Sequence, residues 1–148
     1  MNDALLPIFQ VVQVDDAGQL FISAAIEEWA PLAESKIDVV IDLEGGLDTC
    51  IPNKTNDCVY LYFHITDDNE EEPPMARLRA IAKLGASLIA EGHRVLSHCG
   101  MGFNRSALVA GLILKELGMP GPAVVERLRE RRPGALFNDK FAEVLSAL

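Results

Sequence analysis

The order of apolar and polar stretches along the chain predicts strands that alternate with helices. Apolar runs typical of strands occupy residues 8–14, 20–22, 37–43, 58–65 and 94–97. Apolar residues at helical spacing predict helices over residues 24–34, 75–91, 107–114, 122–131 and 139–147. This alternation indicates an α/β fold with a mostly parallel, twisted sheet of about four to five strands and helices on both faces.

Local signals refine the ends of these elements. Residues 15–18 read Asp-Asp-Ala-Gly, a turn that would join the first two strands into a hairpin. Ser23 can cap a helix that begins at residue 24, and Asn138 can cap the last helix. Gly92 is expected to end the long helix before it.

Size and composition predict one globular domain over residues 1–148. Hydrophobic residues make up 49% and charged residues 24% of the 148 residues, which is typical of a folded chain. No apolar run approaches the roughly 20 residues that span a bilayer, and the first residues lack the basic and apolar regions of a signal peptide. We therefore expect a cytoplasmic monomer with no membrane partner.

The net charge of −9 further narrows the possible partners. General binding to nucleic acid requires a basic surface, so no nucleic acid is expected. A small basic pocket on an acidic protein can still bind a phosphorylated substrate. The charge therefore leaves phosphorylated proteins and small phosphoesters as candidate partners.

The cysteines and histidines bear on redox and metal chemistry. Cys50, Cys58 and Cys99 do not make a secreted disulfide framework, and in a reducing compartment a cysteine within a motif is better interpreted as catalytic. The histidines and cysteines show no metal-ligand spacing along the chain. We therefore expect no metal site and no cofactor.

Residues 98–106, His-Cys-Gly-Met-Gly-Phe-Asn-Arg-Ser, carry the strongest chemical signal. They follow an apolar strand and lead into a buried helix, so successive backbone N–H groups and the helix N-terminus form a cradle for an anion. A thiol in such surroundings ionises more readily than a free one, which makes Cys99 a candidate nucleophile. Arg105 can donate two N–H groups to a phosphate.

The remaining loop residues would bind phosphate through their backbone. These residues are Gly100, Met101, Gly102, Phe103 and Asn104. Taken singly, a buried cysteine, two turn glycines and a surface arginine have ordinary structural explanations. Their combination at this spacing, between a strand and a helix, favours a phosphate-binding nucleophile.

A thiolate that displaces an alkoxide or phenoxide needs an acid to protonate the leaving oxygen. The acidic stretch after the strand at 58–65 supplies candidates at the same edge of a parallel sheet. These candidates are Asp67, Asp68, Glu70, Glu71 and Glu72. Most of them are expected to be solvated, and the chemistry alone does not choose among them.

The pattern His98-Cys99-x-x-Gly102-x-x-Arg105-Ser106 resembles the signature of the cysteine-dependent protein tyrosine and dual-specificity phosphatases. The resemblance continues outside the loop, in residues 19–23, 37–43, 63–67 and 129–135, with Asn138 and Phe141. It covers roughly residues 19–145, and the small size is similar to the compact dual-specificity branch. It implies the fold of that family and hydrolysis of phosphotyrosine, phosphoserine and phosphothreonine.

The resemblance also implies roles for the site residues. Cys99 is the nucleophile that forms a cysteinyl-phosphate, and Arg105 with the loop N–H groups holds the phosphate oxygens. Ser106 is expected to hydrogen-bond the departing thiolate, and His98 to orient the loop backbone and support the thiolate. Asp67 is similar in position to the family's general acid, with Asp68 as the second choice.

Three alternatives remain open. Asn104 before the arginine also resembles the RNA 5′-triphosphatase branch, although that branch typically lacks the acid, and the net charge and Asp67 count against it. The chain could instead be a catalytically inactive phosphate-binding module. A thiol-redox enzyme or sulfurtransferase is the third, in which Cys50 or Cys58 approaches Cys99. The loop carries no lysine, which disfavours inositol lipids as substrates.

Overall fold

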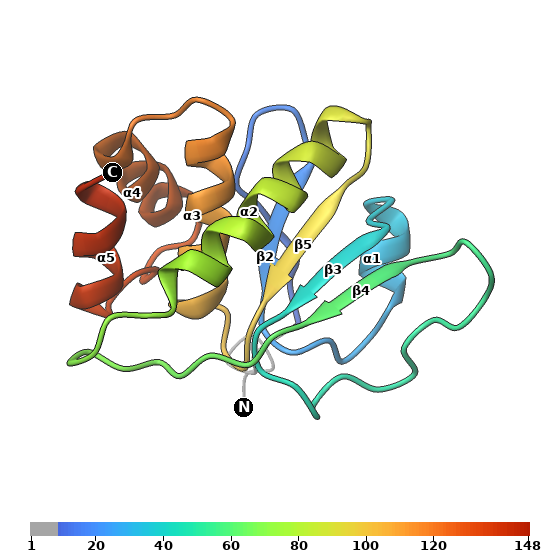
Figure 1. Cartoon of the computed structure of the whole chain (residues 1–148). Coiled ribbons are helices and arrows are strands. Elements are labelled where there is room, and N and C mark those ends of the chain that lie inside the picture. Colours follow the sequence, from blue (N-terminus) through green and yellow to red (C-terminus); the bar gives the residue numbers. More distant parts are fainter. Residues whose placement is uncertain (1–8) are drawn as a thin grey trace, which may run out of the picture.

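The computed structural model describes residues 9–148, so Ile8, at the start of the first predicted strand, lies outside the described residues. The strands are β1 (Val12–Gln13), β2 (Leu20–Ser23), β3 (Val39–Asp42), β4 (Val59–Tyr62) and β5 (Val95–His98). The helices are α1 (Ala30–Glu34), α2 (Met75–Ala90), α3 (Arg105–Glu116), α4 (Gly121–Arg131) and α5 (Asp139–Ser146). The predicted alternation of strands and helices is confirmed (Figure 1).

The five strands form one sheet in the order β1-β2-β5-β3-β4. β1 pairs with β2 in the predicted antiparallel hairpin, and the other neighbours are parallel. Within this register His98 lies level with Ser23 on one side and Asp42 on the other. The carboxyl ends of β2, β5 and β3 therefore meet at one edge of the sheet, where α/β proteins bind ligands.

Successive residues of the central strands are buried on opposite faces of the sheet. One face packs against α2 and α3, with α4 and α5 stacked on α3; it contributes Leu20, Ile22, Val39, Ile41 and Val95. The other face packs against α1 and contributes Phe21, Val40 and Leu96. Helices on both faces explain why the strand at 37–43 is an almost continuous apolar run.

The helix predicted for residues 24–34 is wrong in its first half. Ser23 does not cap a helix: it ends β2, and its hydroxyl donates to the carbonyl of Ala24 at 2.8 Å. Tertiary hydrogen bonds hold the next residues in a loop, because the N–H of Ala25 donates to Gly100 and that of Ile26 to Asp48. The helix begins only at Ala30, followed by a proline, a residue favoured in the first helical turn.

α2 is the longest helix, with 16 residues, and its buried face includes small residues. Ala82 and Gly85 are buried, whereas Leu84, which stands at helical spacing among the apolar residues of this helix, is 45% exposed. A Cβ atom at Gly85 would lie 2.8 Å from the side chain of Ile113, so the glycine lets α2 and α3 approach closely. As predicted, Gly92 ends the helix, at a φ of +97°. In residues 9–148 no helix combines the length and apolarity needed to cross a bilayer.

Candidate active site

The predicted catalytic loop lies between β5 and α3, at the edge where the strand ends meet. Gly102 has a φ of +79°, and a Cβ atom there would lie 2.7 Å from the backbone nitrogen of Ala24. The loop is therefore packed directly on the chain that leaves β2. Two backbone hydrogen bonds strengthen this contact, from Cys99 to the carbonyl of Ser23 at 3.4 Å and from Ala25 to the carbonyl of Gly100 at 3.3 Å.

Cys99 lies at the base of this loop and is 2% exposed. Its sulfur accepts a hydrogen bond from the backbone N–H of Gly102 at 3.2 Å. The first turn of α3 begins at Arg105, so the positive end of the helix dipole lies just beyond the loop. An N–H donor and a helix N-terminus both direct partial positive charge toward the loop, where an anion can be bound.

Arg105 is held by two groups that sequence reasoning missed. Its guanidinium donates to Glu44 at 2.5 Å and to the carbonyl of Ile65 at 3.0 Å, while its Nε atom is buried without a hydrogen-bond partner in the described structure. Glu44 also lies over the loop, since a Cβ atom at Gly100 would be 2.6 Å from its carboxylate. The signal was weak because Glu44 stands in a polar segment that resembles an ordinary loop.

Ser106 follows Arg105 on the first turn of α3 and is fully buried. Its carbonyl accepts a hydrogen bond from Ser97 at 2.9 Å, but its own hydroxyl has no partner among the described residues. A buried hydroxyl without a partner is costly. The hydroxyl is thus free to donate to a group that forms or moves during a reaction.

In the acidic stretch after β4, Asp67 is the residue that hydrogen-bonds the catalytic loop. Its carboxylate accepts from the side-chain amides of Asn104 at 2.8 Å and Asn138 at 2.6 Å. The Asp68 carboxylate instead makes a local contact, since it accepts the backbone N–H of Glu70 at 2.7 Å. The other acidic candidates of this stretch, Glu70, Glu71 and Glu72, are exposed.

His98 is fully buried and belongs to a polar cluster that the sequence did not predict. Its Nε2 atom lies 2.6 Å from a carboxylate oxygen of Asp48 and 3.7 Å from one of Asp42. The Tyr60 hydroxyl lies 2.5 Å from Asp42 and 2.6 Å from Asp48. The Nδ1 atom of His98 has no hydrogen-bond partner within residues 9–148, so its expected contact with the loop backbone is not made.

The protonation of this cluster follows from its burial and hydrogen bonds. Burial by itself would raise the pKa of Asp48, but hydrogen bonds from His98, Tyr60 and the N–H of Ile26, with the charge of His98, outweigh it and lower the pKa. Burial and the two carboxylates strongly raise the pKa of Tyr60, which stays protonated. Asp48 therefore acts as a buried, ionised acceptor beside the residue that precedes Cys99.

Asp42, Asp48 and His98 also have the spacing of a possible metal site, because one ligand atom from each lies within 4.8 Å of the others. The atoms that face one another already have partners, however. The Tyr60 hydroxyl and the His98 ring lie within hydrogen-bond distance of the carboxylates. These hydrogen bonds explain the close approach of the three residues without an ion.

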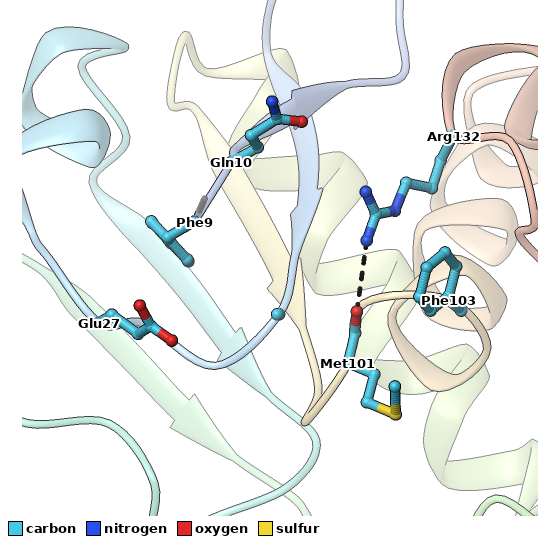
Figure 2. Close-up of a pocket in the computed structure, with 7 residues that line it drawn as sticks. Phe9, Gln10, Glu27, Met101, Phe103 and Arg132 are labelled. Atoms are coloured by element: carbon cyan, nitrogen blue, oxygen red, sulfur yellow. Dashed lines mark hydrogen bonds between the residues drawn. The ribbon is translucent and has the colours of Figure 1, made fainter. Parts of the chain in front are cut away.

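A cavity of about 300 Å³ lies beside the catalytic loop (Figure 2). It is lined by Phe9, Gln10, Ala24, Glu27, Met101, Phe103 and Arg132. The Arg132 guanidinium lies 4.2 Å above the Phe103 ring and donates to the carbonyl of Met101 at 3.4 Å. Met101 is 69% exposed, so the cavity beside the loop presents apolar side chains together with the Arg132 guanidinium and the Glu27 carboxylate.

The cysteines are all free thiols. Cys58 precedes β4, and Cys99 follows β5. Because Val59 at the start of β4 lies level with Val39 and Val95, Cys58 lies at the amino ends of these parallel strands and Cys99 at their carboxyl ends. At about 3.3 Å per residue along a strand, this offset far exceeds the roughly 7 Å limit between the Cα atoms of a disulfide. A Cys58–Cys99 bridge is therefore incompatible with this fold, whereas the suggested pairing of the exposed Cys50 stays a prediction.

Several solved structures share this fold. Human DUSP28 is 21% identical with a TM-score of 0.76, and the match covers 93% of this chain and 90% of that chain. DUSP15 is 20% identical with a TM-score of 0.76, covering 93% and 85%. PTPMT1 in complex with PI(5)P is 16% identical with a TM-score of 0.76, covering 93% and 92%. No curated protein matches the sequence.

The family described as "Dual specificity phosphatase, catalytic domain" matches residues 20–148. The match begins at β2 and extends to the end of the chain, so it includes the catalytic loop, the Asp67 segment and every helix of the fold. The resemblance inferred from residues 98–106 is thereby confirmed. The chain belongs to the dual-specificity phosphatase family, whose members hydrolyse phosphomonoesters by means of a cysteine nucleophile.

Proposed function

We propose that this phosphatase hydrolyses phosphotyrosine and phosphoserine or phosphothreonine esters through a cysteinyl-phosphate on Cys99. One observation carries the proposal. The Cys99 sulfur accepts the N–H of Gly102 inside a loop that Arg105 closes, and Asp67 is tied to that same loop. A nucleophile, an oxyanion clamp and a proton donor thus share one edge of the sheet.

In the first step the Cys99 thiolate attacks phosphorus, the S–P bond forms and the bond from phosphorus to the leaving oxygen breaks. Arg105 and the loop N–H groups bind the three equatorial oxygens, whose charge they stabilise most strongly in the transition state. Asp67 gives its proton to the leaving oxygen. Each Asp67 oxygen accepts one amide N–H, so a lone pair remains on either of them for that proton.

In the second step a water molecule attacks the cysteinyl-phosphate. The Asp67 carboxylate takes a proton from this water, inorganic phosphate leaves and the thiolate returns. The buried Ser106 hydroxyl donates to the departing sulfur, which gives it the partner that it lacks among residues 9–148. Every proton is returned, so the cycle needs neither metal nor cofactor.

The substrate class follows from the surroundings of the loop. The exposed Met101 and the adjacent cavity with Phe9 and Arg132 suit a protein substrate, whose residues on either side of the phosphorylated one can bind there. The net charge of −9 disfavours long nucleic acids as partners. We further propose that residues 1–148 form a single phosphatase domain that acts as a cytoplasmic monomer. Light scattering after size exclusion would check the oligomeric state.

The test is hydrolysis of 4-nitrophenyl phosphate in EDTA by the wild type, Cys99→Ser and Asp67→Asn. Cys99→Ser is expected to lose essentially all turnover, and Asp67→Asn about 10²–10⁴-fold, the usual contribution of a positioned acid. Asp68→Asn is the matched control and should retain activity. Unchanged turnover by Cys99→Ser refutes the mechanism, and a severe loss in Asp68→Asn alone reassigns the acid.

The same preparation separates the branches of the superfamily. Phosphopeptides that contain phosphotyrosine, phosphoserine or phosphothreonine are compared with RNA that ends in a 5′-triphosphate. Release of phosphate from the peptides but not from the RNA supports the proposal. Preference for the RNA would instead support the triphosphatase alternative, and binding without turnover would support an inactive phosphate-binding module.

A further inference from the structure

Asn104 occupies the capping position of α3 but does not cap the helix. Asparagine is among the residues preferred at helix N-caps, where its side chain normally accepts an N–H of the first turn. In α3 no such hydrogen bond is made. The side chain is nevertheless buried, since Asn104 is only 2% exposed. Its amide must therefore have partners elsewhere.

Those partners are the acid and the segment before α5. The Asn104 Nδ2 atom donates to Asp67 at 2.8 Å, and its Oδ1 atom accepts the backbone N–H of Asn138 at 2.9 Å. A backbone N–H can only donate, so the oxygen of the amide must face Asn138 and the nitrogen must face Asp67. The orientation of the amide is thus fixed by chemistry, and the donor points at the carboxylate.

Asn104 differs from the other contacts of Asp67 because it belongs to the catalytic loop. The loop around the acid is exposed at Thr66 and Asn69, so little packing holds it. Asn138 provides the second donor to the carboxylate, but it belongs to the segment before α5 rather than to the catalytic loop. Among the described residues of the catalytic loop, Asn104 is the one whose side chain hydrogen-bonds Asp67.

We propose that Asn104 is a positioning residue that fixes the proton donor Asp67 relative to the nucleophile Cys99. This inference rests on the proposed role of Asp67 as the acid. An amide N–H can donate to a carboxylate and equally to the carbonyl oxygen of a carboxylic acid, so the contact survives each transfer of the proton. Proximity of this kind contributes to the rate only where the proton must move, which is when the leaving oxygen is basic.

The test compares a poor leaving group, in phenyl phosphate, with a good one, in 2,4-dinitrophenyl phosphate. Asn104→Asp keeps the size of the side chain and the acceptor for Asn138, but replaces the donor to Asp67 with a carboxylate oxygen. The ratio of kcat/KM on phenyl phosphate to that on the dinitrophenyl ester is expected to fall about 10- to 100-fold. Asn69→Asp adds the same charge at an exposed position of the acid loop and should leave the ratio unchanged.

Two further variants complete the design. Asn104→Ser withdraws the donor without adding charge and should show the same selective loss, which covers a failure of Asn104→Asp to fold. In Asp67→Asn the acid is absent, so adding Asn104→Asp to it should cause no further fall in the ratio. A fully non-additive cycle of this kind indicates that the two residues act through one step.

The outcomes separate this inference from the function on which it rests. Equal losses on both esters, or no loss on either, in Asn104→Asp and Asn104→Ser would overturn the positioning role while leaving Asp67 as the acid. If Asp67→Asn itself loses no selectivity between the esters, the acid assignment fails and the positioning role fails with it. If Asn69→Asp lowers the ratio of kcat/KM on the two esters as much as Asn104→Asp does, the added charge alone explains the loss, and the inference is overturned too.

Discussion

Replacing Asp48 with asparagine would break the buried cluster around His98, next to the proposed nucleophile Cys99, while keeping the shape of the side chain. The Asp48 side chain is 1% exposed. One carboxylate oxygen accepts the backbone N–H of Ile26 at 2.8 Å, and the other lies 2.6 Å from both Tyr60 and His98. In Asp48→Asn the first bond can persist, but the charged acceptor for the other two groups is lost.

The magnitude follows from these contacts. A hydrogen bond to a charged group contributes about 1.5–3 kcal/mol, and the loss of one member of a buried charged pair costs roughly 3–5 kcal/mol. Because the Asn side chain retains one bond and the Tyr60 hydroxyl still donates to Asp42, we expect Asp48→Asn to lower the free energy of unfolding by about 2–4 kcal/mol. Against a typical total of roughly 5–15 kcal/mol, this is a large fraction.

Urea unfolding followed by fluorescence measures this difference directly. The single tryptophan, Trp29, donates to the carbonyl of Thr49, next to Asp48, so its emission reports on the loop concerned. Asp57→Asn, an exposed change on the same loop, is the matched control and should alter the free energy by less than about 0.5 kcal/mol. Equal midpoints and slopes for the two variants at pH 7 would refute the stabilising role of the cluster.

The pH dependence supplies a second check. The pKa of Asp48 lies below its ordinary value of 3.8 in the folded protein, because the hydrogen bonds and the charge of His98 outweigh burial. The folded state therefore binds the proton less readily than the unfolded state does. The stabilisation is present above pH 3.8 and is lost as the pH falls through the lower folded value. The gap between wild type and Asp48→Asn should be constant near neutral pH and close only in acid.

Three other predictions concern the loop, its arginine and a surface histidine. Gly102 has a φ of +79°, and an added Cβ would lie 2.7 Å from the backbone of Ala24, so Gly102→Ala should abolish turnover of 4-nitrophenyl phosphate. Gly118 has a φ of +108° but open space around it, so the control Gly118→Ala should lower Tm without abolishing turnover. Glu44→Gln removes the charge that holds the guanidinium of the catalytic loop and should reduce kcat/KM about tenfold, as for a lost charged hydrogen bond, with an unchanged Tm as the control. The hydrogen bond that the His93 ring donates to the Asp38 carboxylate raises the pKa of His93 above 6.5. An NMR titration should therefore give a higher midpoint that Asp38→Asn lowers, and any stabilisation would be lost as the pH rises through this midpoint. A His93 midpoint unaffected by Asp38→Asn would contradict the pairing.

The catalytic loop could be located from the sequence because its chemistry is local. A cysteine, two glycines and an arginine within nine residues, placed between an apolar strand and an apolar helix, require no knowledge of distant contacts. The alternation of strands and helices likewise follows from periodicity, and the structure confirms it. The family match confirms the family that the loop motif indicated, while the roles of the loop residues stay a proposal. The Asn138 cap of α5 was equally local, since its side chain accepts the N–H of Phe141 three positions along.

The partners of the site could not be found in this way, because they meet only through the register of parallel strands. Glu44 and Asp48 follow β3 in a segment that looks like a solvated loop, yet the alignment of β3 with β5 carries them to Arg105 and His98. The same tertiary contacts keep residues 24–29 out of the helix that their composition favours.

The sequence by itself therefore determined the candidate nucleophile, the proposed phosphate-binding loop and the class of fold, which depend on spacing along the chain. Only the tertiary structure decided that Asp67 rather than Asp68 reaches the loop, and that Asn104 turns its amide to Asp67 instead of capping α3. The physical reason is that these hydrogen bonds join residues brought together by strand pairing and helix packing. Their partners lie dozens of positions away, where no local pattern records them.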